Sequence, residues 1–120
     1  MKVETSQAKG QVLNYLVAKC EGVEIVCVKN GQATFIDHTD GGALNEMPIN
    51  YSTAWSQGGP IIERERIELW GDGDEGWIAY DNLNPKQKGP TPLIAAMRCY
   101  VASKLGDEVD VPDELITVEA

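Results

Sequence analysis

The stretch TPLIAAMRCYVASKLG, residues 91–106, decides the fold that we expect for this chain. Thr91 can cap a helix, and Pro92 suits the first helical position because its missing N–H would have no intrahelical partner there. Gly106 can end the helix. Only three of the intervening side chains are strongly polar, so this helix is expected to be buried on more than one side. The chain's own sheet or a second subunit could cover it, and a homodimer through helix 91–105 is one prediction.

The segment RIELWGDGDEGWIAYD, residues 66–81, predicts a β-hairpin with a six-residue loop. Trp70 then faces Trp77 on the side turned away from the core. The pairs on the core-facing side are Ile67 with Tyr80 and Leu69 with Ile78. The loop GDGDEG offers carboxylates for calcium, but the Gly and the bidentate Glu that an EF-hand loop needs are missing from its later positions. We therefore interpret it as a solvated turn.

A second hairpin is predicted over residues 23–38, VEIVCVKNGQATFIDH. It would turn at Asn30-Gly31, because both residues tolerate the positive φ of a type I′ turn. The predicted register pairs Val26 with Phe35, Val28 with Ala33 and Ile25 with Ile36. Both faces are largely apolar, so we expect this hairpin to be covered on both sides.

An amphipathic helix is predicted over residues 6–21, with Ser6 as its cap and Gly22 as its end. The order of helix, hairpin, irregular corner, hairpin and helix predicts an α+β fold. In that fold, an antiparallel sheet is built from the two hairpins, and the N-terminal and C-terminal helices pack on it. A chain of 120 residues can bury a core of its own, so we expect a single domain over residues 1–120.

The connection between the hairpins is predicted to be irregular. Residues 39–50 are interpreted as a polar loop and residues 51–60 as a corner of the structure. A Ser or Thr would cap a single helical turn, which Gly58-Gly59 would end. Pro60 would then open a second short turn.

The chain is acidic, with 19 acids, 10 bases and a net charge of −9. Residues 61–120 hold 13 of the acids against six bases, and residues 107–120 hold six acids and no base. Such a charge repels phosphates and argues against a nucleic-acid partner. The acids could form a solubilising surface and C-terminal tail over about 107–120, or an acidic face that docks on a basic partner or mimics DNA. Val109 and Val111 alternate within this tail as an expected edge strand.

The sequence favours a cytoplasmic protein without a membrane segment. No apolar run approaches the roughly 18 residues of a membrane span, and the first residues lack the basic start and apolar core of a signal peptide. Cys20, Cys27 and Cys99 are odd in number and lie in apolar stretches, as is typical of free buried thiols.

Two blocks, STAWSQGGPIIE at 52–63 and GPTPLIAAMR at 89–98, together resemble the NinX-like family of small proteins from lambdoid phages and prophages. The helix GQVLNYLVAKCEG at 10–22 and the ending LGDEVDVPDEL at 105–115 fit the same family, so the resemblance spans nearly the whole chain. It implies a phage or prophage accessory protein that acts inside a bacterial host. The family implies no established biochemical activity, so no catalytic residue is carried over.

The residues that could carry chemistry lack a supporting pattern. His38 is the single histidine, with Asp37 and Asp40 nearby, but the sequence has no CxxC, no His pair and no nucleophile elbow. Each cysteine lies at an apolar position where a thiol is usually inert. The glycine-rich SQGGP lacks the lysine of a phosphate-binding loop. We therefore predict no catalytic residue, no metal ligand and no cofactor.

Exposed aromatic and arginine side chains are the remaining candidates for function, because Trp and Arg carry a large share of binding energy at interfaces. The candidate interaction surface consists of Trp55, Arg64, Arg66, Trp70 and Trp77. The first hypothesis is a non-catalytic protein that binds an unidentified host or phage protein. The alternatives are a small enzyme or ligand-binding protein with a pocket under residues 39–62, and an acidic DNA mimic.

Overall fold

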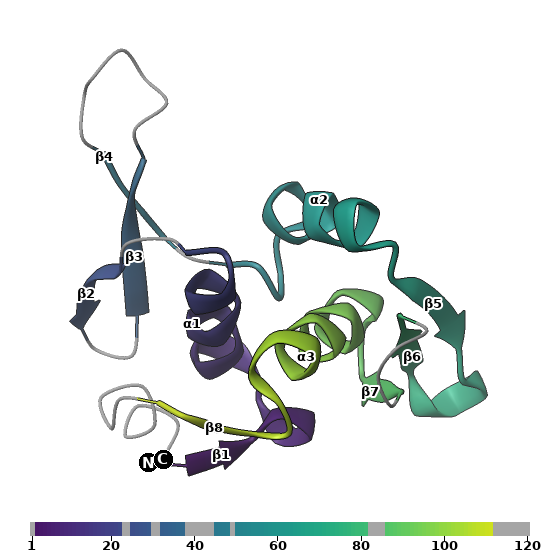
Figure 1. Ribbon diagram of the computed structural model, residues 1–120. Coiled ribbons are helices and arrows are strands. Elements are labelled where there is room, and N and C mark those ends of the chain that lie inside the picture. The colour runs from purple at the N-terminus through teal and green to yellow at the C-terminus, as the bar shows by residue number, and fades with distance from the viewer. Residues whose placement is uncertain are drawn as a thin grey trace.

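The computed structural model describes residues 2–22, 25–29, 32–37, 45–48, 50–81 and 86–111. Over these residues the chain forms the helices α1 (Gly10–Cys20), α2 (Trp55–Glu65) and α3 (Pro92–Leu105), with eight strands in three antiparallel sheets (Figure 1). The expected α+β class is thereby confirmed.

The two predicted hairpins lie in separate sheets, and each sheet has a third strand. One sheet consists of β2 (Ile25–Lys29), β3 (Gln32–Asp37) and β4 (Asn45–Pro48). Another consists of β5 (Glu68–Gly71), β6 (Trp77–Tyr80) and β7 (Gln87–Gly89). The third sheet has two strands, β1 (Lys2–Glu4) and β8 (Glu108–Asp110). Two short 3-10 turns, η1 (Thr5–Gln7) and η2 (Gly73–Glu75), complete the described elements.

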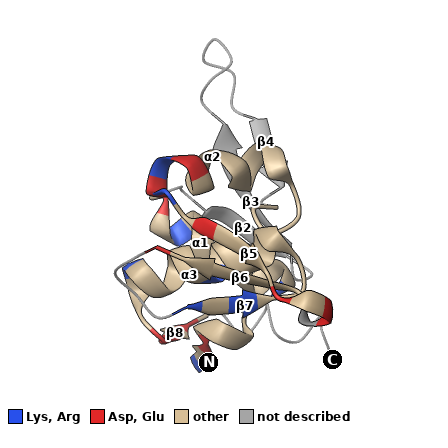
Figure 2. Cartoon of the chain, turned by 90° about the vertical axis from the view of Figure 1, so that its right-hand side faces the viewer, with Lys and Arg blue, Asp and Glu red and all other residues tan. Residues whose placement is uncertain are grey.

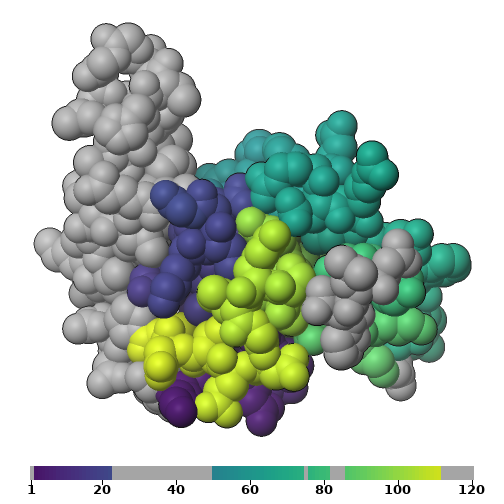
Figure 3. All heavy atoms as spheres, viewed as in Figure 1, coloured from purple at the N-terminus to yellow at the C-terminus, as the bar shows by residue number. Residues whose placement is uncertain are grey.

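Helix α3 is the centre of the structure, as its composition predicted. The Oγ1 atom of Thr91 accepts a hydrogen bond of 3.1 Å from the N–H of Ile94, and the helix ends at Gly106, whose φ is +91°. Helix α3 packs against α1, α2 and the β5–β6–β7 sheet (Figure 1), and the space-filling view shows its atoms against those of α1 and α2 (Figure 3). Its buried residues are Leu93, Ala95, Ala96, Met97, Cys99, Tyr100, Val101 and Ala102. The chain's own elements thus bury most of α3, and a homodimer through this helix stays a prediction.

Helix α1 begins later than predicted, and Ser6 does not cap it. Residues 5–7 form η1, because Thr5 is held by the far end of the chain: its N–H donates to the carbonyl of Asp107 and its hydroxyl to that of Gly106. The positive φ of Gly10, +56°, then redirects the chain into the helix. The predicted end is confirmed, since Gly22 has a φ of +70° directly after the last turn.

The predicted corner at residues 51–60 is wrong: Gly58, Gly59 and Pro60 lie inside one continuous helix, α2. Packing overrides the local helix-breaking tendency here. A Cβ atom on Gly58 would lie 2.5 Å from the backbone oxygen of Tyr51 and 2.6 Å from Cδ1 of Leu93, so only glycine allows this approach of α2 to α3.

The end of α2 uses an unusual residue. Arg66 has a φ of +55° and a ψ of +44°, a left-handed conformation that usually calls for glycine. The N–H of Ile67 donates to the carbonyl of Ile62 at 3.1 Å, and the N–H of Arg66 to that of Glu63 at 3.4 Å. This pattern closes the helix and turns the chain into β5.

The hairpin of β5 and β6 forms, but its predicted register is wrong by one residue. Trp70 pairs with Ile78, and Gly71 pairs with Trp77. Gly71 belongs to the strand, and the loop begins only at Asp72, whose N–H donates to the carbonyl of Gly76. A slip of one residue turns every side chain of one strand to the other face, so the predicted Trp70–Trp77 pair does not form.

The hairpin of β2 and β3 agrees with the prediction only near its turn. Val28 pairs with Ala33 as predicted, but an irregularity between Ile25 and Cys27 shifts the register, so that Ile25 pairs with Phe35. The Asn30-Gly31 turn lies outside the described residues. The loop predicted for residues 39–50 is also wrong in part, because it contains the strand β4.

The start of the acidic tail is structured as expected. Val109 lies on β8 and is buried, as is Val111, and the partner strand β1 was missed in the sequence. Residues 112–120 lie outside the described part of the chain. None of the described helices has both the length and the apolar character needed to cross a membrane.

Candidate functional site

The five predicted interface residues do not lie on one surface. Trp70 and Trp77 sit on opposite faces of the β5–β6–β7 sheet, since Trp70 pairs with Ile78 and the adjacent Gly71 pairs with Trp77. Trp70 is 62% exposed, Trp55 54% and Trp77 37%. Among the large hydrophobic side chains that the structure describes, Trp70 is thus the most exposed, and it is the natural centre of a candidate site.

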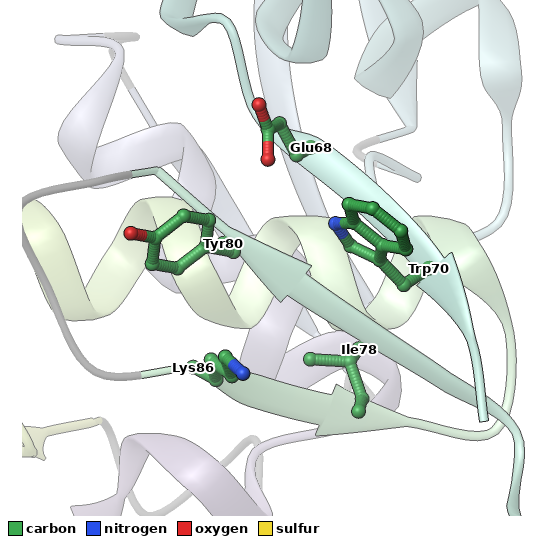
Figure 4. Close-up of a pocket in the computed structure, with 5 residues that line it drawn as sticks. All are labelled: Glu68, Trp70, Ile78, Tyr80 and Lys86. Carbon is green, nitrogen blue, oxygen red and sulfur yellow. The ribbon is translucent and has the colours of Figure 1, made fainter.

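Trp70 belongs to what we call the outer face, the side of the β5–β6–β7 sheet that is turned away from α3. Its residues are Glu68, Trp70, Ile78, Tyr80, Lys86 and Lys88. The first five line a shallow pocket of about 480 Å³. Figure 4 shows them on the near side of the sheet, with α3 running behind it.

The outer face is arranged in two rows that cross the sheet from β5 to β7. Glu68 pairs with Tyr80 in the first row, which Lys86 continues. Trp70, Ile78 and Lys88 form the second row, through the pairs Trp70 with Ile78 and Ile78 with Lys88. Ile78 and Tyr80 therefore occupy the middle, Glu68 and Trp70 lie at the β5 edge, and two bases lie at the β7 edge.

This distribution of charge is local and differs from the acidic average of the chain. Figure 2 views the molecule from the side of this sheet and shows the bases along β7. Lys88 lies 3.9 Å from the carboxylate of Asp72, a partly exposed pair that contributes little to stability. The alternation Lys86-Gln87-Lys88 places the buried Gln87 toward α3 and both lysines outward. A period of two with charged outer positions is typical of an edge strand, and this signal for β7 was missed in the sequence.

Ile78 and Tyr80 were assigned to the core and lie instead on the outer face. Ala79, between them, is fully buried and faces α3. Leu69 and Ile67 are on the core-facing side as predicted.

Trp77 faces the same side as Gly89, which comes very close to α3. A Cβ atom on Gly89 would lie 2.6 Å from the backbone nitrogen of Ala95. The glycine of the block GPTPLIAAMR is therefore required for packing of β7 on the first turn of α3. Trp77 borders this packed region and does not share the pocket of Trp70.

Trp55 lies in a separate groove at the start of α2. A pocket of about 210 Å³ is lined there by Ser52, Thr53, Trp55, Thr91, Pro92, Leu93 and Ile94. Three of these residues belong to the segment 39–62, under which a pocket was predicted, and that pocket stays a prediction. His38 and residues 39–44 lie outside the described residues.

Arg64 serves a structural network at the far end of α2. Its Nη1 and Nη2 atoms donate to the two carboxylate oxygens of Glu21, at 3.0 and 2.6 Å, and Nε donates to Glu65 at 2.8 Å. The Tyr100 hydroxyl donates to the same Glu21 carboxylate, and the guanidinium lies 5.6 Å from the Tyr100 ring centre. The network thus joins α2 and α3 to Glu21, which directly follows the last residue of α1.

The network shifts the ionisation of its members. The hydrogen bond from Arg64 lowers the pKa of Glu21, and the bond from Tyr100 acts in the same direction against the effect of burial. Burial, followed by the hydrogen bond to Glu21, raises the pKa of Tyr100. Both shifts favour the ion pair with a neutral tyrosine beside it.

The two described thiols, Cys99 (buried) and Cys20 (partly buried), are weakly acidic. Burial raises the pKa of Cys99 to about 12 and that of Cys20 to about 11, so neither is a thiolate near neutral pH. Cys99 is fully buried on α3, which fits the predicted free buried thiol. Within the described ranges, no three His, Cys, Asp or Glu side chains gather as a metal site would require.

Three of the four stretches that resemble a phage family, residues 10–22, 52–63 and 89–98, meet in space. Asn14 of α1 accepts two hydrogen bonds from Ser52, one from its N–H at 2.8 Å and one from its hydroxyl at 2.7 Å, and all these groups are buried. Gly58 lies against Leu93. The sequence model of the family described as NinX of bacteriophage P22 matches residues 4–104. The chain belongs to this NinX family.

The match extends from the end of β1 to the last turn of α3. It therefore includes the blocks 52–63 and 89–98 and all residues of the outer face. The resemblance stated from the sequence is confirmed. No curated protein matches the chain. Gly58 and Gly89 of these blocks serve packing against α3, and residues 52–63 and 89–98 include none of the outer-face residues.

Proposed function

We propose that this NinX-family chain is a non-catalytic accessory protein of a phage or prophage that binds a host or phage protein through the outer face. The observation that carries the proposal is the position of Trp70. It is 62% exposed and lies beside Ile78 and Tyr80, both partly exposed, on the face that α3 does not cover (Figure 4). An aromatic side chain held on a sheet costs little conformational entropy when it is buried by a partner.

The gain from covering Trp70 is large enough to anchor an interface. A buried Trp removes about 150–250 Å² from water, and about 25 cal/mol per Å² applied to the exposed part gives roughly 2–4 kcal/mol. That is the magnitude of an interface hot spot. Ile78 and Tyr80 would add apolar contact around it, and the charged residues at both edges would form the polar rim.

The site chemistry supports binding over catalysis. The two described thiols have raised pKa values and so are poor nucleophiles near neutral pH. Glu68 and Lys86, the charged residues of the pocket, lie at its edges and are exposed. We also expect the protein to act in the cytoplasm of the bacterial host.

The small-ligand alternative has weaker support. The described part of the segment 39–62 lines a pocket of about 210 Å³, below the roughly 300–1,000 Å³ of typical ligand sites. The DNA-mimic alternative needs acids spaced like phosphates along one face. Figure 2 instead shows acids and bases close together on the side of the β5–β6–β7 sheet.

The test is a pull-down of tagged protein from a lysate of the bacterial host, with two matched variants. Trp70→Ala removes the proposed anchor, and Trp55→Ala removes a tryptophan of similar exposure from the separate groove at the start of α2. A stoichiometric partner should be retained by the wild type and by Trp55→Ala and lost by Trp70→Ala. Titration of the purified partner should then show at least about a tenfold loss of affinity for Trp70→Ala.

Two results would reject the proposal. In the first, the folded wild type captures no partner. In the second, Trp70→Ala, with an unchanged circular dichroism spectrum and melting temperature, captures the partner as well as the wild type does. A partner lost only with Trp55→Ala would move the site to the groove between α2 and α3.

A further inference from the structure

The outer face is self-complementary about its central strand. β6 lies between β5 and β7, so a two-fold axis parallel to β6 and between two copies brings β5 of one copy over β7 of the other. Glu68 of one copy then meets Lys86 of the second, because both residues lie in the first row. Trp70 meets Lys88, because both lie in the second row.

We propose that a second copy of this chain covers the outer face when no other partner is bound. In this dimer, β6 lies over β6 of the second copy, so Ile78 contacts Ile78 and Tyr80 contacts Tyr80. The two sheets pack with their strands nearly aligned, at the usual spacing of about 10 Å and crossing angle of about 30°. The contact is isologous, so each pairing of unlike residues occurs twice.

Charge complementarity selects this occupant. The Glu68–Lys86 contact joins opposite charges, and the Trp70–Lys88 contact places an ammonium over an indole ring. Each pairing needs the acid at the β5 edge and the bases at the β7 edge, as Figure 4 shows for Glu68 and Lys86. A face with one sign of charge at both edges would repel its own copy.

The size of the face predicts a weak dimer. Three strands of three or four residues present much less area than the roughly 800 Å² per partner of a stable interface. The net charge of −9 per chain adds a repulsion between copies that salt screens. A weak dimer also fits the proposed function, because a protein partner can displace the second copy. This inference rests on the proposed function only for the choice of face.

The test is sedimentation equilibrium of the full chain at physiological salt, over a concentration series that extends to about 1 mM. The series compares the wild type with Glu68→Lys, Lys86→Glu and the double variant that carries both changes. Each single reversal should raise the dimer dissociation constant at least about tenfold, because it places like charges together twice. The double variant should return to within about threefold of the wild type, because the pair is restored with its signs exchanged.

Matched controls separate this contact from general charge effects and from other interfaces. Glu63→Lys changes the net charge as Glu68→Lys does, but at an exposed position on α2, and should not weaken the dimer. Trp70→Ala should weaken it. All of the substituted side chains are exposed, so the variants should keep the wild-type circular dichroism spectrum.

Three outcomes would overturn the inference: a monomer at every concentration, a dimer insensitive to Trp70→Ala and to both reversals, or a double variant as weak as the singles. The first would leave the proposed function standing if the pull-down succeeds, with another protein as the occupant of the face. A sensitive dimer without any captured partner would support this inference and reject the proposed function.

Discussion

Gly58 on α2 lies directly against Leu93 on α3, so closely that a Cβ atom on Gly58 would be 2.6 Å from Cδ1 of Leu93. The backbone oxygen of Tyr51 would be 2.5 Å from the same Cβ atom. The Tyr51 oxygen belongs to the backbone and cannot give way as a side chain can, so only glycine fits at this point of α2, between Tyr51 and Leu93. The contact of Gly58 with Leu93 also joins the two sequence blocks by which the NinX family is recognised.

The first prediction concerns the neighbouring glycines of α2. Gly58→Ala should lower the free energy of unfolding by about 1–3 kcal/mol, because the added methyl group overpacks a rigid contact. Gly59→Ala is the matched control: its Cβ atom would have Trp55 Cε3 at 3.7 Å, an ordinary van der Waals distance. It should change the free energy of unfolding by less than about 1 kcal/mol, because the helix preference of alanine is offset by crowding of its Cβ atom against the ring of Pro60. Urea unfolding of the three proteins measures both effects, and equal values for the two variants would contradict the packing explanation.

The second prediction concerns the end of α2. Arg66→Gly should raise the free energy of unfolding by about 0.5–1 kcal/mol, because glycine adopts a φ of +55° without the steric cost that arginine incurs. Arg66→Ala is the control, since it removes the guanidinium but keeps the Cβ atom. Thermal and urea unfolding should show a gain for Gly only. A similar gain for Ala would mean that the arginine side chain, and not the backbone, is unfavourable at this position.

The third prediction uses the lowered pKa of Glu21. A carboxyl whose pKa is lower in the folded state than its ordinary value of 4.5 stabilises the fold above that value. The contribution is lost as the pH falls from 4.5 through the folded pKa. Glu21→Gln should therefore cost about 1 kcal/mol near pH 7, a value reduced by the half-exposed Arg64 partner.

The measurement for Glu21 is urea unfolding of the wild type and of Glu21→Gln between about pH 7 and pH 3. The difference between the two proteins should be constant above pH 4.5 and should shrink below it. Glu63→Gln, an exposed position on α2, provides the control for a lost carboxyl without this network. A difference that grows toward low pH would have the wrong sign for a lowered pKa.

Local sequence signals succeeded where the chain's own backbone chemistry decides the structure. Thr91, Pro92 and Gly106 delimit α3 as predicted, because capping and the proline ring act within a few residues. The end of α1 at Gly22 was predicted for the same reason. The predicted break at Gly58-Gly59-Pro60 was wrong. The buried contact between the helices outweighs a helix-breaking propensity of about 1 kcal/mol per glycine.

The register of the β5–β6 hairpin could not be predicted from local sequence signals. The GDGDEG segment fits a loop of six residues or of five, and the choice turns on whether Gly71 pairs with Trp77. Nothing local to the hairpin separates these possibilities, although they exchange the two faces. The burial of Ala79 against α3 settles the register, because a small residue suits the close approach of helix and sheet.

The candidate site shares this dependence on register. The sequence correctly marked Trp70 as an aromatic on the side away from the core, but it grouped Trp70 with Trp77 and placed Ile78 and Tyr80 inside. The arginines were also placed on the interface, whereas Arg64 binds Glu21 and Arg66 ends α2. Lys86 was not considered, because β7 has only three residues and its alternating lysines were not interpreted as a strand.

By itself, the sequence determined the α+β class, the boundaries of α3, the acidic charge and the membership in the NinX family, because these depend on composition, on short-range capping and on blocks of adjacent residues. Only the tertiary structure decided that α2 runs through Gly58-Gly59-Pro60, which side of the sheet Trp77 occupies, and that Trp70 shares a face with Lys86 and Lys88. These features depend on contacts between residues far apart in the chain. These contacts form only when α3 packs against α1, α2 and the β5–β6–β7 sheet together, so the sequence of one segment does not predict them.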